Sequence, residues 1–304
     1  IVIILKLLLF LIANIQRNSI IILYLFLKML KKPLANNTPI KQLGEFGLID
    51  HLTKEIKLKH VGSVFGVGDD AAVIDAGNKY QLASTDLLVE GIHFNLAYTP
   101  LKHLGYKSVA VNVSDICAMN GVPKQIMIGI AISNRFTVEA VDELYQGIRL
   151  ACNHYDIDLV GGDTTSSTSG LMLSVSILGE VEKDIITFRG GAKINDLVVC
   201  TGDLGAAYLG LQLLNRENMI FKDNPKIQPD LSGNDYVLRR QLKPEAGTKY
   251  IKILSDMKIV PTSMIDISDG LASEALHISK NSKIYGIMEI SQKLKIMMDL
   301  LFMG

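Results

Sequence analysis

Apolar and polar positions follow two different rhythms along the middle of the chain. Short apolar runs predict strands, at about 61–67, 80–85, 124–132 and 171–178. Apolar residues at helical spacing predict helices, at 44–59, 100–120 and 137–153. Because the two kinds of element are interleaved, the pattern predicts an α/β or α+β fold class.

The pattern changes near residue 183, where we expect a second unit to begin. LVVCTG at 197–202 predicts a strand, and GAAYLGLQLL after it predicts a helix. Residues 215–236 are polar and predict a loop, while SMIDISDG at 263–270 predicts a further strand followed by a turn. The order of these elements predicts a second α/β domain.

Both ends of the chain differ from its middle. Residues 1–30 are almost wholly aliphatic, but no uninterrupted apolar stretch within them reaches the roughly 18–20 residues that cross a bilayer. No cleavage site of small residues follows them. A membrane anchor and a targeting segment stay open, but we favour a non-native apolar extension over 1–28, with Met29 as the true start. After Lys283 the apolar, Met-rich sequence has no helix cap or closing turn, so we expect a truncation or a frameshift there. The expected domains are 29–182 and an incomplete 183–304.

Composition narrows the classes of partner and compartment. Lys plus Arg and Asp plus Glu both number 31, so the formal net charge is zero and no nucleic-acid or anionic-membrane partner is expected. Cys117, Cys152 and Cys200 are widely spaced in apolar runs, which predicts neither a zinc site nor a disulfide framework. A reducing, cytoplasmic setting follows as the default.

Five short runs end in aspartate: GVGDD at 66–70, ASTD at 83–86, VNVSD at 111–115, LVGGD at 159–163 and MIDISD at 264–269. Any one of these aspartates alone would be read as a helix cap or turn residue. Strands of one sheet end on the same side, however, so the five carboxylates are expected to converge. Clustered carboxylates repel one another unless a cation or protons neutralise them, and Mg²⁺ with oxygen ligands and substrate phosphates fits such a cluster.

Two glycine-rich segments admit other interpretations. GVGDDA fits the dinucleotide fingerprint, with Asp86 at about the expected distance, but two aspartates in that turn would oppose the pyrophosphate without a metal. GGDTTSS at 161–167 predicts either a flexible loop or a turn whose amides and hydroxyls cradle phosphate beside Asp163. Neither a P-loop nor the protein-kinase motif set occurs.

Seven segments, taken in order, carry a family resemblance: GEFGLIDHL, GVGDDAAVI, STDLLVEGIHF, YKSVAVNVSDICAMNGVPK, LVGGDTTSS, FRGGAKINDLVVCTG and IDISDGLASEALHIS. They resemble the thiamine-monophosphate kinases, in the superfamily of aminoimidazole ribonucleotide synthetase and selenophosphate synthetase. The resemblance covers about residues 43–285, and STDLLVEGIHF with GEFGLI is specific within the superfamily.

The resemblance implies a two-domain PurM-like α/β fold whose N-terminal domain binds metal and ATP and forms homodimers through its sheet. It implies ATP-dependent transfer of the γ-phosphoryl group to thiamine monophosphate, with several Mg²⁺ ions and no covalent enzyme intermediate. The family's later Gly-Gly-Glu-Asp-Tyr-Glu stretch and late aromatic residue, which hold the thiamine moiety, have no counterpart here. Another enzyme of the same superfamily, or an inactive nucleotide- or metal-binding fragment, is therefore the alternative.

The resemblance also assigns site residues, none of them catalytic beyond the metal-binding aspartates. The implied metal ligands are Asp70, Asp86, Asp115, Asp163 and Asp266, with Asp69 and Asp269 in support and further oxygens from Ser84 and Thr85. The implied ATP-binding residues are Gly162, Asp163, Arg189 and Ser268. His93 is the implied substrate-binding residue.

Overall fold

The computed structural model of the protein describes residues 39–284, and the chain divides into two compact units after Lys57. The apolar segment 1–28 and the sequence after residue 284 lie outside the described residues, so the expectations for both ends stay predictions. The expected border near residue 182 falls inside the second unit and likewise stays a prediction.

The described part of the first unit is helical. A short 3-10 helix, η1 (Ile40–Gln42), precedes α3 (Gly44–Thr53). The predicted helix at 44–59 is thus confirmed over its first ten residues but ends earlier than expected. At the end of α3 the Thr53 hydroxyl donates a hydrogen bond of 2.8 Å to the carbonyl of Ile49, a local bond that competes with the helix ladder.

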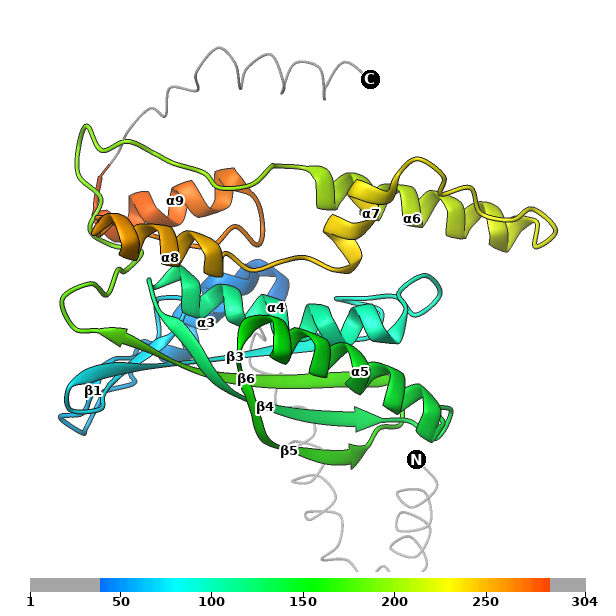
Figure 1. Ribbon diagram of the computed structural model, residues 1–304, viewed down its shortest axis with the longest axis horizontal. Helices are drawn as coiled ribbons and strands as arrows, with labels where there is room; N and C mark the ends of the chain where they lie inside the picture. The colour runs from blue at the N-terminus through cyan, green and yellow to red at the C-terminus, as the bar shows by residue number, and fades with distance from the viewer. Residues whose placement is uncertain (1–38, 285–304) are drawn as a thin grey trace, which may run out of the picture. The chain divides into compact units, whose positions relative to one another are not determined.

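The second unit contains a mixed six-stranded sheet (Figure 1). Its strands are β1 (Ser63–Phe65), β2 (Ala72–Asp75), β3 (Lys79–Val89), β4 (Val122–Ile132), β5 (Asp158–Ser166) and β6 (Leu171–Glu182). The strand order is β1-β2-β3-β6-β4-β5, and β4 and β5 form the single parallel pair of this sheet. The mixed α/β class and the strands corresponding to β1, β3, β4 and β6 are confirmed.

The predicted turn at 161–167 is wrong, because most of these residues belong to β5. All nine residues of β5 are exposed, so this edge strand has no alternation of buried and exposed positions that sequence reading could detect. Its backbone is ordered by parallel pairing with β4 instead, from Gln125 opposite Asp158 to Ile132 opposite Ser166. The four-residue strand β2 was too short to predict.

Two helices, α4 (Leu101–Ala118) and α5 (Val138–Tyr155), cover one face of the sheet, as Figure 1 shows. Both were predicted from their periodicity. They approach closely, because a Cβ on Gly105 would lie 2.0 Å from the carbonyl oxygen of Leu144, and one on Gly147 would lie 1.9 Å from that of Lys102. The face of α4 that includes Leu104 and Ser108 is buried, and it carries Asp115.

The chain after residue 183 forms helices α6 (Ala206–Asp223), α7 (Asp235–Leu242), α8 (Thr248–Met257) and α9 (Leu271–Ser282). The described residues beyond β6 include no strand, so the strands predicted at 197–202 and 263–270 are wrong. Leu197, within the first of these runs, is 91% exposed. An apolar run becomes a strand only where a neighbouring strand completes its backbone hydrogen bonds. The loop predicted at 215–236 is also partly wrong, since α6 continues to Asp223.

Hydrogen bonds join this helical region to α4 and α5. The ammonium group of Lys107 donates to the carbonyl of Gln241 at 3.3 Å, near the end of α7. The backbone N–H of Ala246 donates to the hydroxyl of Tyr155 at 2.9 Å. These contacts attach the chain that follows β6 to the helical layer that also carries Asp115.

Two further features are the hydropathy of the helices and the state of the cysteines. None of the helices between residues 39 and 284 combines the length and the hydropathy needed to cross a membrane. All three cysteines are free, and burial raises the pKa of Cys117 to about 12 and that of Cys152 to about 11. Both buried thiols are therefore protonated at neutral pH.

Candidate active site

The turn GVGDDA joins β1 to β2 and places two adjacent aspartates in different roles. Gly68 has a φ of +129°, a conformation that favours glycine. Asp69 stabilises the turn: its Oδ1 accepts from the N–H of Asp70 at 3.0 Å, and its Oδ2 accepts from the N–H of Arg189 at 3.0 Å. The Asp70 side chain takes no part in these two hydrogen bonds, and the residue is buried.

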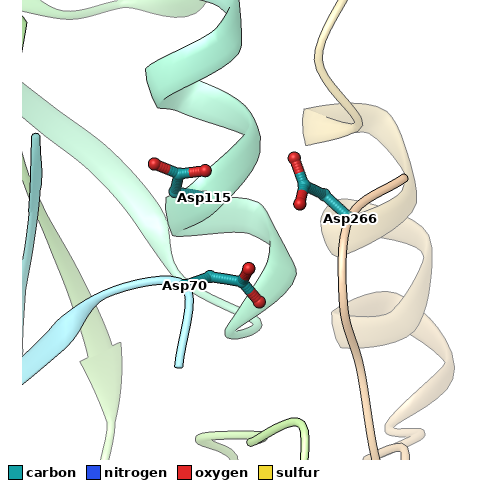
Figure 2. A group of neighbouring side chains, drawn as sticks. All are labelled: Asp70, Asp115 and Asp266. Carbon is teal, nitrogen blue, oxygen red and sulfur yellow. The ribbon is translucent and has the colours of Figure 1, made fainter. Parts of the chain in front are cut away.

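Asp70 meets two other carboxylates that come from distant parts of the chain (Figure 2). Asp115 lies on α4, and Asp266 lies in the segment that precedes α9. Each of the three offers one oxygen atom, and these atoms all lie within 4.8 Å of one another. Asp70, Asp115 and Asp266 are called the acidic cluster below. Of the five aspartate runs that were expected to converge at strand ends, the structure brings these three together from a turn, a helix and the segment before a helix.

Two serine hydroxyls orient the cluster. Ser84 of β3 donates a hydrogen bond of 2.6 Å to Oδ2 of Asp115, and Ser114 donates one of 2.7 Å to Oδ2 of Asp266. Ser114 and Asp115 are adjacent on α4, so one turn of this helix contacts both the sheet and the Asp266 segment. Short bonds from hydroxyl groups to carboxylates are charge-assisted and fix the direction of the acceptor.

Burial and mutual repulsion disfavour the charged forms of these aspartates. The pKa of Asp115 is raised to about 8, first by burial and then by the charge of Asp86. The pKa of Asp266 is raised to about 6, again by burial and then by the charge of Asp70. Burial also raises the pKa of Asp86, and the charge of Asp266 adds to this effect. Asp86 therefore lies close enough to belong to the same electrostatic site.

The guanidinium of Arg189 contacts this site directly. Its guanidinium Nη2 forms an ion pair with Oδ1 of Asp70. Burial, together with the charges of Asp69 and Glu274, nevertheless leaves the pKa of the Asp70 carboxyl above its ordinary value. One arginine does not balance the acidic cluster, and Oδ2 of Asp70 is buried without a hydrogen-bond partner among the described residues. Hard carboxylate oxygens with surplus negative charge fit a divalent cation such as Mg²⁺.

Thr85 points away from the cluster. Successive side chains of a strand alternate between the two faces of a sheet, so Thr85 faces opposite to Ser84 and Asp86. Its hydroxyl donates to the carbonyl of Val175 at 3.0 Å and lies 3.0 Å from the hydroxyl of Ser176. The Thr85 side chain is thus engaged with β6 in this structure.

Asp163 also lies apart from the cluster within one chain. Asp163 on β5 lies opposite Gly129 on β4. Gly129 lies opposite Ser174 on β6, and Ser174 lies opposite Leu87 on β3. Residues directly opposite on neighbouring strands share a face, so Asp163 lies on the Leu87 face, away from Asp86. Three strand spacings, roughly 14 Å, also separate β5 from β3. A hollow of about 490 Å³ beside β5, lined in part by Tyr145 and Asp163, is separate from the acidic cluster as well.

Gly162 has a packing role that the sequence did not reveal. A Cβ at this position would lie 2.0 Å from the carbonyl oxygen of Ile128 on β4. We expect Gly162→Ala to destabilise the fold by about 1–3 kcal/mol, because the parallel strands would have to move apart. Thermal unfolding measures this loss, and Gly161→Ala is the matched control, since its nearest neighbouring atom lies 3.9 Å away. Unchanged stability of Gly162→Ala would show that this close approach is not required.

The remaining expected residues lie on the loops around the site. Ser268 and Asp269 are exposed and lie just before α9. His93 is exposed, its Nδ1 accepts from the N–H of Val89 at 3.0 Å, and its ring lies close enough to Asp86 to influence the pKa of that carboxyl. The structure therefore places His93 near Asp86, while the roles assigned to these residues stay predictions.

Sequence reading missed two residues of the site. Ser114 lies within the VNVSD run, and its position next to Asp115 was the available signal. Glu274 is buried close to the cluster, where its charge helps to raise the pKa of Asp70 and Asp266. Its place in the first turn of α9 is that of an ordinary helix glutamate, so nothing in the local sequence distinguishes it.

Comparisons with known proteins agree on one family. The family model described as AIR synthase related protein, N-terminal domain, matches residues 68–181. The thiamine-monophosphate kinase of Bacillus subtilis (strain 168) is 36% identical over 241 residues, which are 79% of this chain and 71% of that protein. The thiamine-monophosphate kinase of Aquifex aeolicus (strain VF5) is 35% identical over 261 residues, 86% of this chain and 78% of that protein.

Solved structures give the same result. A structure described as AaThiL complexed with AMPPCP and TMP superposes with a TM-score of 0.69 at 32% identity, over 82% of this chain and 74% of that one. The thiamine monophosphate kinase of Aquifex aeolicus gives a TM-score of 0.63 at 30% identity, over 81% of this chain and 74% of that one. These relatives share both sequence and fold with this chain.

Proposed function

Since this chain belongs to the thiamine-monophosphate kinase family, we propose that it transfers the γ-phosphoryl group of ATP directly onto the phosphate of thiamine monophosphate, with Mg²⁺ bound by the acidic cluster. That it is a kinase follows from the family. The observation that supports the metal-dependent reaction is the convergence of Asp70, Asp115 and Asp266 in a partly buried site with surplus negative charge. The complex of a relative with AMPPCP, an analogue of ATP, and TMP supports both substrates.

The residues act by positioning charge rather than by forming a covalent intermediate. Asp70, Asp115 and Asp266 bind the cation, and Ser84 and Ser114 keep two of these carboxylates in fixed orientations. When bound, Mg²⁺ supplies positive charge to the phosphate oxygens and to the charge that develops in the transition state. Asp86 adds negative charge at the edge of the same site.

The neighbouring residues are assigned to the two substrates. We assign Arg189 to the nucleotide phosphates, because its guanidinium lies at the cluster and already contacts Asp70. Ser268 and Asp269 lie on the exposed turn before α9, and we assign them to the nucleotide and to cation binding. His93 is assigned to the substrate because it is exposed close to Asp86.

We further propose that the protein is a homodimer formed through the open face of the sheet. Leu87, Met127 and Met172 are 55%, 40% and 38% exposed, and they lie on strands whose opposite face is covered by α4 and α5. Asp163 shares this face and would serve a site at the dimer interface. The reducing cytoplasm is the compartment we propose, as expected from the free cysteines.

Charge on this face should prevent dimer formation. We expect the wild-type protein to have twice the mass of one chain in light scattering, and Leu87→Glu to have the mass of a single chain, because a buried unpaired carboxylate is costly at an interface. Val138→Glu, at an exposed position of α5, is the control and should leave the mass unchanged. Equal masses for the wild type and Leu87→Glu would exclude this face as the interface.

The proposed reaction is tested by incubating the chain with ATP, Mg²⁺ and thiamine monophosphate and by measuring thiamine diphosphate chromatographically. We expect product to form only when all three are present. The alternative is an inactive nucleotide- or metal-binding fragment, or another ATP-dependent reaction of the superfamily. Nucleotide binding without product formation, at every concentration of thiamine monophosphate tested, would favour that alternative.

A further inference from the structure

Glu274 is a buried carboxylate beside the acidic cluster to which the proposed reaction gives no role. It lies in the first turn of α9, and the residue is only 4% exposed. Its charge contributes to the raised pKa values of both Asp70 and Asp266. No ion pair joins it to a lysine, arginine or histidine in the described part of the chain. A charge is rarely buried in this way without a specific purpose, because desolvation is costly.

The two oxygens of Glu274 differ in their contacts. Oε1 accepts a hydrogen bond of 2.9 Å from the backbone N–H of Asp269, and the hydroxyl of Ser268 lies 3.5 Å from the same oxygen. Oε2 is buried and has no hydrogen-bond partner among residues 39–284. Glu274 is therefore bonded to the turn that carries Ser268 and Asp269, and it retains one unoccupied acceptor.

This bond ties the helix to the turn before it. The N-cap residue of α9 is Gly270, which has no side chain and a φ of +129°. Glu274 accepts from the N–H of Asp269, one residue before this N-cap, much as the glutamate of a capping box reaches back to the start of its helix. The turn that begins at Asp266 is thus connected to the rigid helix through Glu274, as well as through the peptide chain.

We propose that Glu274 is a positioning residue for cation binding: by accepting the hydrogen bond from Asp269, it holds the segment from Asp266 to Asp269 so that Asp266 faces Asp70 and Asp115. The proposal rests on the proposed function in one respect, namely that the acidic cluster binds a divalent cation. It assigns the effect to the reach of the side chain and not to its charge.

Two substitutions separate reach from charge. Glu274→Gln retains a side-chain oxygen at the same distance and loses the charge, whereas Glu274→Asp retains the charge on a shorter side chain that does not reach the N–H of Asp269. We expect Glu274→Gln to bind Mn²⁺, used as the probe for Mg²⁺, within about 3-fold of the wild type. We expect Glu274→Asp to bind it about 10- to 100-fold more weakly, the range seen when a residue that orients a metal ligand is lost.

The measurement is titration of the purified full chain with Mn²⁺, in which electron paramagnetic resonance reports the free ion and no turnover is needed. Glu217→Asp is the matched control: Glu217 is 7% exposed on α6 and likewise accepts from a backbone N–H, that of Asp230, at 3.0 Å. It should lower thermal stability without changing the affinity for Mn²⁺.

Three outcomes would overturn the proposal. If Glu274→Gln and Glu274→Asp weaken Mn²⁺ binding equally, the effect is due to the charge of Glu274. If both variants bind Mn²⁺ with wild-type affinity, Glu274 has no role in cation binding. If Glu217→Asp also weakens Mn²⁺ binding, the loss reflects general destabilisation. A wild-type chain that binds Mn²⁺ but forms no thiamine diphosphate contradicts the proposed reaction alone, so the two failures are distinguishable.

Discussion

Replacement of Asp115 by asparagine is expected to lower kcat/KM for thiamine monophosphate by roughly 10³-fold, which corresponds to a loss of about 4 kcal/mol of transition-state stabilisation. Asp115 is one of the three carboxylates that offer an oxygen to the same small volume, and it is held there by the hydroxyl of Ser84. An amide keeps the size of the side chain and removes the charge that a cation requires. Phosphoryl transfer measured at saturating ATP and Mg²⁺ tests this expectation.

The same substitution should not destabilise the metal-free protein. Because burial and Asp86 already disfavour the charged form of Asp115, a neutral amide is expected to leave the melting temperature unchanged or to raise it at pH 8. Asp75→Asn is the control, since Asp75 lies at the end of β2 and pairs with Lys183 away from the cluster. Activity of Asp115→Asn close to that of the wild type would show that the acidic cluster is structural.

The stability of the metal-free protein is expected to fall as the pH rises from about 4 to about 8. In this window the folded state binds more protons than the unfolded chain, because Asp266 and Asp115 titrate near 6 and near 8 in the folded state and near 3.8 when unfolded. The stabilisation is therefore complete below pH 4 and is lost as the pH passes through both folded-state values. Thermal unfolding in EDTA across this range measures the effect.

Divalent cations should reverse this loss. A ligand present at about 100 times its dissociation constant stabilises the folded state by about 2.7 kcal/mol, which raises the melting temperature by roughly 5–10 °C for a protein of this size. The gain from Mg²⁺ should be larger at pH 8 than at pH 5.5, since protons compete with the cation for the same oxygens. Asp115→Asn should weaken both the pH dependence and the response to Mg²⁺. A melting temperature that is insensitive to Mg²⁺ at pH 8 would argue against a cation site.

Most helices and strands in the first half of the fold could be predicted from the local sequence. Apolar residues recur at helical spacing in 100–120 and 137–153, and this pattern was sufficient to predict α4 and α5. Short apolar or alternating runs at 80–85, 124–132 and 171–178 were sufficient to predict β3, β4 and β6. Strand β5 escaped prediction because its residues are exposed on an edge. The apolar run at 197–202 was predicted as a strand but is not one. Its composition is that of a strand, but the described structure gives it no pairing partner.

For the candidate site, too, the sequence determined some features and the tertiary structure determined others. The sequence by itself determined which residues are chemically suited to bind a cation, because the recurring aspartate runs are visible as letters. Only the tertiary structure decided that Asp70, Asp115 and Asp266 form one cluster while Asp163 lies on the opposite face of the sheet. Residue type fixes the chemistry of each oxygen, but the distance between residues far apart in the chain depends on how strands register and helices pack. The burial of Glu274 beside the cluster is set by the same packing and has no signature in the neighbouring sequence.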